Sequence, residues 1–244
     1  MRSRHTRGNG LGPAQGWSSA VPALTPGWPR LPRVDESTSG AGPFIAFEGG
    51  DGAGKSTQVA LLAAAFERAG RQVVVTRQPG GTELGAQIRE LLLHGAHVAP
   101  RAEALLFAAD KAQHVELVVA PALAAGQVVI TDRYTDSSVA YQGAGRSLGA
   151  AEVADLQSWA VGGLFPDLTV LLDIAVGVGR ARRGSVHDRL ESEDDGFHVA
   201  VRTHFLALAA AAPERYLVID AALAPGRIHD AVRARLEAQG VLTR

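Results

Sequence analysis

The sequence predicts a doubly wound α/β domain, and three observations support this. Short apolar runs alternate with longer helical stretches from Pro43 onward. Runs that are apolar throughout are typical of strands buried on both faces of a parallel sheet, and their alternation with helices predicts that the helices cover that sheet. A glycine-rich segment directly after the first run lies where such folds bind phosphate groups.

Five runs are expected to be strands, at residues 44–47, 72–76, 128–130, 168–172 and 216–219. The longest helical pattern covers residues 101–124, where apolar residues recur every three or four positions. We expect one buried stripe there, made of Leu105, Ala108, Ala112, Val115 and Val119.

The first 41 residues are rich in Pro, Gly and Arg and show no helical or strand period. Such a segment buries too little surface to offset its chain entropy, so we expect residues 1–41 to be disordered and residues 42–244 to form the folded domain. The composition is also that of an organelle transit peptide, although no amphipathic helix is visible. An over-extended start codon explains the segment equally well.

Bulk properties exclude several function classes. The formal net charge of -1 implies no general attraction to nucleic acid or to an anionic membrane. The chain has no cysteine, which excludes disulfides and thiol catalysis. No apolar run approaches the roughly 18 residues that a membrane span needs. We expect a cytoplasmic protein with small-molecule substrates.

Residues 49–56 read GGDGAGKS and fit the phosphate-loop pattern G-x-x-x-x-G-K-[ST], between a strand and a helix. Glycines let successive backbone N–H groups turn toward phosphate oxygens, and the helix N-terminus adds partial positive charge. Lys55 is expected to reach the outer phosphates, and the Ser56 hydroxyl to ligate Mg²⁺. The expected ATP-binding residues are Gly49, Gly50, Asp51, Gly52, Ala53, Gly54, Lys55, Ser56 and Thr57.

Asp132 ends the third apolar run and is expected to lie beside Mg²⁺, together with Ser56. Arg77 follows the second run and precedes a Pro-Gly-Gly turn, where it can clamp an anion. An ordinary strand-to-helix turn is the plainer interpretation. Because the carboxyl ends of parallel strands meet at one edge of the sheet, both residues are candidates for one site.

Phe107, Lys111 and His114 share a second face of the helix from residue 101, away from the expected stripe. An aromatic ring one turn from a cation suits a nucleobase. By pattern alone, a core phenylalanine with a solvated lysine is the simpler interpretation. The segment after Asp132 adds Ser138, Tyr141 and Gln142, which can contact a base edge and a sugar or simply cap a helix.

An arginine cluster follows the fourth apolar run. Phosphoryl transfer needs positive charge that balances the equatorial oxygens, and a segment that keeps water out. A solvated charged helix is the usual alternative for such a run. The members of the cluster are Arg180, Arg182, Arg183 and Arg189.

Six segments in one order resemble the thymidylate kinase family over about residues 43–240. They are FEGGDGAGKST at 47–57, TRQPGGT at 76–82, LLFAADKAQH at 105–114, DRYTDSSVAYQGAGR at 132–146, PDLTVLLD at 166–173 and DRLE at 188–191. The resemblance implies the nucleoside-monophosphate kinase fold: a five-stranded parallel sheet with a P-loop and an arginine-bearing lid over 180–191. It implies transfer of the γ-phosphoryl group of ATP to dTMP, with Mg²⁺ as cofactor, in a homodimer.

The same resemblance implies residue roles. Asp51 would lie near the acceptor, Arg133 would grip the acceptor phosphate with Arg77 nearby, and Phe107 would stack on thymine. Ser138, Tyr141 and Gln142 would surround base and sugar. The phosphate loop contains no arginine, so the family pattern places the catalytic arginine in the lid, as Arg183 first and Arg189 second. The expected catalytic set is therefore Lys55, Asp51, Arg133, Arg183 and Arg189.

Two positions depart from the family pattern. Gln78 stands where the family usually has Glu, and Lys111 stands where it usually has Arg. Lysine is a point charge and cannot reproduce the planar bidentate guanidinium, so we expect weaker acceptor binding than is usual in the family. Three alternatives stay open: a kinase for another nucleotide, a P-loop ATPase that acts on a macromolecule, and a non-catalytic homologue.

Overall fold

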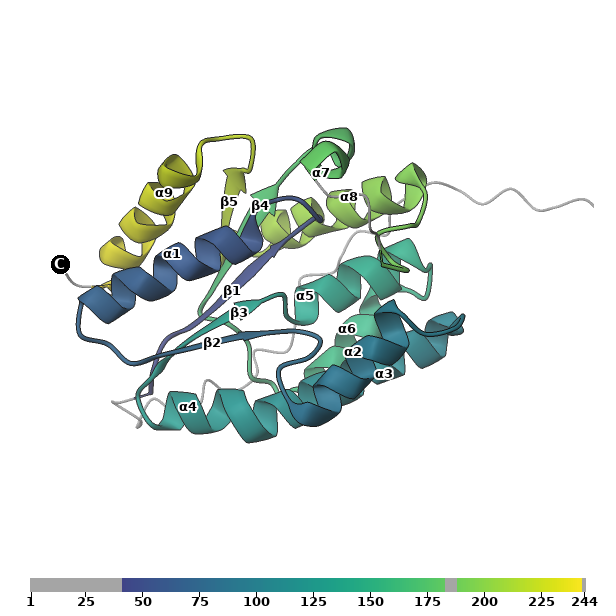
Figure 1. Cartoon of the computed structure of the whole chain (residues 1–244), viewed down its shortest axis with the longest axis horizontal. Helices are drawn as coiled ribbons and strands as arrows, with labels where there is room; N and C mark the ends of the chain where they lie inside the picture. The colour runs from purple at the N-terminus through teal and green to yellow at the C-terminus, as the bar shows by residue number, and fades with distance from the viewer. Residues whose placement is uncertain (1–40, 183–187, 243–244) are drawn as a thin grey trace, which may run out of the picture.

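The computed structural model describes residues 41–182 and 188–242. The expectations for the N-terminal tail and for Arg183 therefore lie outside the described residues, apart from residue 41. Within the described part, the chain forms one parallel sheet with helices on both faces (Figure 1). The α/β fold class expected from the sequence is confirmed.

The sheet has the strand order β2-β3-β1-β4-β5, and every neighbouring pair is parallel. The strands are β1 Phe44–Gly49, β2 Val73–Arg77, β3 Val128–Asp132, β4 Leu168–Asp173 and β5 Tyr216–Asp220. Alternate residues of β1 point to opposite faces, because the side-chain period of a strand is two. Ile45 and Phe47 join the core that α1 and α9 cover, while Phe44 and Ala46 join the core on the other face.

The expectation that every strand is buried on both faces is wrong for the two edge strands. Val75 in β2 is 53% exposed and Val218 in β5 is 46% exposed, whereas β1 is buried at every position. A strand at the edge of a sheet has no neighbour on one side, so its apolar residues pack less completely. Composition alone does not distinguish an edge strand from a central one.

Helices connect the strands along the chain. They are α1 Lys55–Arg68, α2 Glu83–Leu93, α3 Pro100–His114, α4 Ala120–Ala124, α5 Thr135–Ser138, α6 Ala150–Ala160, α7 Val176–Arg182, α8 Asp195–Ala211 and α9 Pro225–Ala238, with π-helical turns η1 Val115–Val119 and η2 Val139–Gly145. The backbone stays helical from α3 through η1 into α4. The wider turn η1 ends just before Pro121, whose ring would clash with a carbonyl of a regular α-helix.

The buried stripe expected on this helix is wrong at its first member. Leu105 is 58% exposed, while Phe107, Lys111 and His114 are buried. The helix therefore turns its mixed aromatic and charged face inward and one of its leucines outward. Apolar periodicity misplaced Leu105, whereas Ala108 and Val119 of the same stripe are buried as expected. The pattern also missed the buried polar residues, because polar side chains that find partners are compatible with the interior.

Candidate active site

The carboxyl ends of the three strands β1, β2 and β3 meet at one edge of the sheet. In the parallel register Asp132 lies beside both Phe47 and Arg77. The loops that follow these strands therefore lie together, as ligand sites do in open α/β sheets. They line a cavity of about 950 Å³.

The phosphate loop connects β1 to α1 and opens into this cavity. Gly54 precedes the first residue of α1 with φ 88°, and Gly52 has φ 79°, a region that L-residues adopt at a cost. Gly52 is also constrained sterically, since a Cβ there would lie 2.3 Å from the Gly179 carbonyl oxygen in α7. The N-terminus of α1 faces the loop, which gives an anion both N–H donors and a favourable dipole.

Of the expected ATP-binding residues, six line the cavity: Asp51, Gly52, Gly54, Lys55, Ser56 and Thr57. Lys55 donates from Nζ to the carbonyl oxygens of Gly49 (3.1 Å) and Gly50 (2.9 Å). Burial lowers the pKa of Lys55, and the Arg133 charge lowers it further. The other three expected residues, Gly49, Gly50 and Ala53, belong to the loop but do not line the cavity.

Ser56 and Asp132 come together as expected for a metal site. The Ser56 hydroxyl, on α1, donates to Oδ2 of Asp132, at the end of β3, at 2.9 Å. Among the described residues no group of three His, Cys, Asp or Glu side chains gathers to hold a metal. One hydroxyl and one carboxylate still fit Mg²⁺, which keeps several waters and takes substrate phosphates as ligands.

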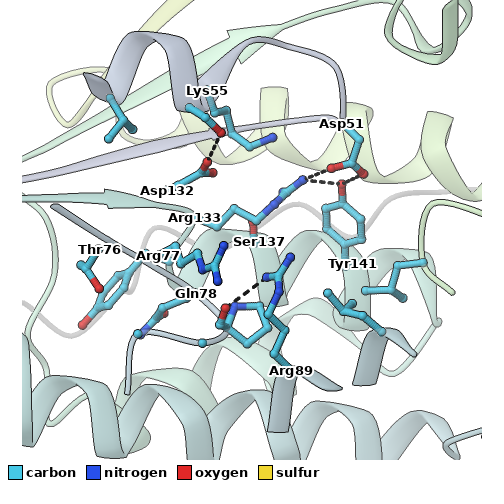
Figure 2. A pocket seen from close by; sticks show the side chains of 18 of the residues that line it. Asp51, Lys55, Thr76, Arg77, Gln78, Arg89, Asp132, Arg133, Ser137 and Tyr141 are labelled. Atoms are coloured by element: carbon cyan, nitrogen blue, oxygen red, sulfur yellow. Dashed lines mark hydrogen bonds and ion pairs between the residues drawn. The ribbon is translucent and has the colours of Figure 1, made fainter. Parts of the chain in front are cut away.

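Arg133 connects the phosphate loop to the acceptor side (Figure 2). Its guanidinium forms an ion pair with Asp51 and donates to Gly49 O (3.1 Å), Ser137 Oγ (3.0 Å) and Tyr141 Oη (3.3 Å). Burial opposes the charge on Asp51, but Arg133 and Lys55 outweigh it and hold the pKa of that carboxyl well below its usual range. Both ends of the pair thus stay charged.

Glu48 stabilises the turn after β3 that contains Arg133. Sequence reasoning did not identify Glu48. Arg133 has φ 69°, which is unfavourable for a residue with a side chain. The buried Glu48 carboxylate accepts from Tyr134 N (2.8 Å), Ser137 N (3.1 Å) and Ser137 Oγ (2.6 Å). Burial, reinforced by Asp136, raises the pKa of Glu48 to about 7.

A second arginine, Arg89, faces the cavity beside Arg77 (Figure 2). Arg89 lies on α2 and donates to Pro79 O at 3.1 Å. Burial and then the Arg77 charge lower its pKa. Two neighbouring guanidinium groups favour an anionic ligand. Sequence reasoning missed Arg89, because no local pattern shows which face of α2 turns toward the cavity.

The other residues that the sequence predicted for an acceptor nucleotide also line this cavity. These are Phe107, Lys111, Ser138, Tyr141 and Gln142, from α3, α5 and η2. Lys111 is only 1% exposed and donates from Nζ to Ser138 Oγ at 2.8 Å, with its charge 5.3 Å from the centre of the Phe107 ring. Burial lowers the pKa of Lys111 to about 8. The solvated lysine considered from the pattern is therefore wrong.

Gln78 contacts a buried histidine. Its Nε2 lies 2.6 Å from His114 Nδ1, and the other ring nitrogen lies 2.7 Å from Thr76 Oγ1. Burial and then the Lys111 charge lower the pKa of His114 to about 4, so the ring is neutral near pH 7. An amide at position 78 suits a neutral imidazole, since neither group needs a counter-charge.

Of the two lid candidates, only Arg189 lies among the described residues. Arg183 lies outside the described residues, and Arg189 pairs with the buried Glu103 at 2.6 Å without lining the cavity. Arg182, which the sequence analysis placed in the arginine cluster but not in the catalytic set, does line it, and donates to Ala221 O at 2.8 Å. Its position at the end of α7 was the available signal.

Comparison with known proteins gives a consistent result. The family model for thymidylate kinase matches residues 47–232. The chain is 59% identical over 201 residues to the thymidylate kinase of Clavibacter michiganensis subsp. michiganensis, covering 81% of this chain and 95% of the relative. It is 57% identical over 204 residues to that of Leifsonia xyli subsp. xyli, covering 82% and 97%. A Synechococcus thymidylate kinase is 53% identical over 199 residues, covering 79% and 96%. No helix in the described part of the chain is long and apolar enough to span a membrane.

Proposed function

The chain belongs to the thymidylate kinase family, and on this premise we propose that it transfers the γ-phosphoryl group of ATP to dTMP, giving ADP and dTDP. One observation supports this most directly. A single cavity is lined by the phosphate loop on one side and by Arg77, Arg89 and the Phe107 face of α3 on the other. A donor and an acceptor nucleotide in that cavity would meet at Arg133.

In the proposed reaction the bond from the γ-phosphorus to the ADP oxygen breaks, and a bond from the same phosphorus to a dTMP phosphate oxygen forms in line with it. The acceptor oxygen is already anionic, so no general base is needed. Lys55 and the α1 N-terminus would bind the ATP phosphates, and Arg77 and Arg89 the dTMP phosphate. Arg133 would position both, so that catalysis rests on orientation and charge compensation.

Phe107 would stack on the thymine ring, with Lys111, Ser138, Tyr141 and Gln142 around the base and sugar. Ser56 and Asp132 would hold Mg²⁺, which when bound neutralises charge on the phosphates. The hydrogen bond between these two side chains supports this, because it brings two hard oxygen ligands together at the phosphate loop. Arg182 would supply positive charge from α7.

We propose a homodimer for the active protein. Large apolar side chains are exposed on three neighbouring helices: Leu91 on α2 (56%), Leu105 on α3 (58%) and Trp159 on α6 (81%). These helices lie side by side in Figure 1. Large exposed apolar residues on helices that contact one another favour a protein interface. A cytoplasmic location stays a prediction.

The test is ADP release by the purified protein with ATP, offering dTMP, dUMP, dCMP, dGMP, AMP or no acceptor, each with and without Mg²⁺. We expect turnover with dTMP, a weaker signal with dUMP and none without Mg²⁺. Turnover without any acceptor would identify an ATPase. No ADP release with any acceptor would contradict the proposed function. Faster ADP release with another nucleotide than with dTMP would show that the proposed substrate is wrong.

A further inference from the structure

Glu103 is a carboxylate that the proposed chemistry leaves unused. It lies in the first turn of α3 and is 0% exposed. A buried charge is costly unless charged and hydrogen-bonded partners surround it. Glu103 is surrounded in this way, and its partners hold its pKa below the ordinary value although burial opposes this.

The partners come from two segments far apart in the sequence. Gln142 Nε2 donates to Oε1 at 2.9 Å, and Arg146 donates from Nε at 3.2 Å. Arg189 forms an ion pair with Oε2 at 2.6 Å. Glu103 is therefore a three-way junction between α3, η2 and the turn at residues 188–193.

The same arginine fixes that turn to the end of α2. Arg189 donates its backbone N–H to Leu93 O at 3.1 Å and its Nε to Leu92 O at 2.8 Å. The two carbonyls belong to the last turn of α2, where intrahelical partners are lacking. The next residue, Leu190, is 7% exposed and joins the core that contains Phe107 and Tyr141. The ion pair thus anchors one wall of the cavity.

The two segments that Glu103 joins, η2 and the 188–193 turn, both line the cavity, although Glu103 itself does not. Gln142 lines the cavity from η2, and Asp188, Leu190 and Glu191 line it from the turn, whereas Glu103 and Arg189 do not line it. We propose that Glu103 is a positioning residue that couples the 188–193 turn to Gln142, so that the turn and the nucleoside end of the acceptor site keep one relative position. This inference rests on the proposed function for what binds there.

Loss of the negative charge of Glu103 would affect both η2 and the 188–193 turn. With Glu103→Gln, Arg189 would have no counter-charge in a site where its side chain is 17% exposed, and a guanidinium without one favours solvent. The turn would then leave the end of α2, and Gln142 would lose an ionic acceptor. The phosphate loop makes none of these contacts, so ATP binding should change little.

The test compares Glu103→Gln with Glu237→Gln in the full chain. Glu237 pairs with Arg233 on α9 at 2.9 Å and is 26% exposed, so its variant removes a paired carboxylate that lies outside α3, η2 and the 188–193 turn. In Glu103→Gln the KM for dTMP should rise roughly tenfold, as for loss of one charged hydrogen bond, while the KM for ATP stays within about threefold. Glu237→Gln should leave both KM values within about threefold.

Amide hydrogen exchange gives a readout that does not depend on turnover. Peptides that cover residues 188–193 and 139–146 should exchange at least about tenfold faster in Glu103→Gln, while peptides of the β-sheet stay unchanged. Arg189→Gln should reproduce the change, and the double variant should add less than the sum of the two. Unchanged exchange at 188–193 would overturn the inference, as would equal acceleration in the sheet. Failure of the kinase assay alone would instead count against the proposed function.

Discussion

Arg133 and Asp51 form an ion pair that joins the end of strand β3 to the phosphate loop (Figure 2). The Arg133 guanidinium also donates hydrogen bonds to Ser137, Tyr141 and the Gly49 carbonyl. A single guanidinium therefore connects the donor and acceptor parts of one cavity. If both nucleotides bind there, the position of this group decides how well the reacting oxygens line up.

Replacement of Arg133 by lysine should cost more in turnover than in ATP affinity. A lysine keeps the charge but cannot reach four acceptors with one planar fork. We expect kcat to fall by about 100-fold, the size seen when one charge-stabilising donor is lost, with the KM for ATP within about threefold. Steady-state kinetics with both substrates measure this. Arg233→Lys, in a surface ion pair on α9, is the control. A kcat within about threefold of wild type would refute the role.

Binding of dTMP should depend on pH through Lys111. Burial lowers the pKa of this lysine to about 8, so the proton that favours an anionic or carbonyl ligand is present below pH 8 and lost above it. The KM for dTMP should rise between pH 7 and 9, a range in which the dTMP phosphate is already about 90% or more doubly ionised, because its second pKa is about 6. In Lys111→Arg the profile should be flat and the KM lower. Parallel profiles would exclude Lys111 as the cause, and an unchanged KM would show that lysine does not weaken acceptor binding.

Glu48→Gln should change how stability varies with pH. The folded pKa of Glu48 is raised from 4.5 to about 7, so its contribution is most favourable below pH 4.5 and is lost as pH rises through 7. Glutamine does not titrate. From pH 5 to 8 the variant should therefore gain stability relative to wild type, by up to about 3 kcal/mol. Denaturant unfolding at several pH values measures the difference. A difference that is constant with pH would show that Glu48 is charged throughout.

A charge on the exposed apolar helices should separate the proposed dimer. Leu105→Glu places a carboxylate on α3 where the leucine is 58% exposed, so the folded monomer should tolerate it while an apolar interface should not. Sedimentation at micromolar concentration should give a dimer for wild type and a monomer for the variant. Leu223→Glu, 47% exposed beside α9, should stay dimeric. A monomeric wild type would contradict the proposal.

The part of the site that the sequence predicted is the part encoded locally. The phosphate loop depends on residue spacing within one turn, and Asp132 and Arg77 depend on each following a strand run. Asp132 and Arg77 then lie side by side because the strands they end are parallel neighbours in the sheet. Phe107 and Lys111 both line the cavity, and their role toward a base stays a prediction. The pattern alone favoured a solvated lysine, because helical periodicity carries no information on the distant Ser138, which accepts a hydrogen bond from the buried Lys111.

Residues that act through long-range contacts were not predictable in this way. Glu48 and Glu103 contact partners 39 to 89 positions away in the sequence, which no local spacing encodes, as their hydrogen bonds with Ser137 (separation 89) and Gln142 (separation 39) illustrate. Arg189 was selected for its place in an arginine cluster, yet its side chain pairs with Glu103 outside the cavity lining. An arginine in this cluster is a reasonable candidate for a phosphate ligand, but in the folded chain Arg189 has Glu103 as its ionic partner.

The most direct test of the central claim is titration with an analogue in which adenosine and thymidine are joined through five phosphates. If one cavity holds donor and acceptor side by side, the analogue should bind one per chain, compete with both ATP and dTMP, and bind at least about 100-fold more tightly than either nucleotide, because the second half binds at high effective concentration. An analogue that only one of the two nucleotides displaces, or that binds no more tightly than a single nucleotide, would contradict a shared cavity.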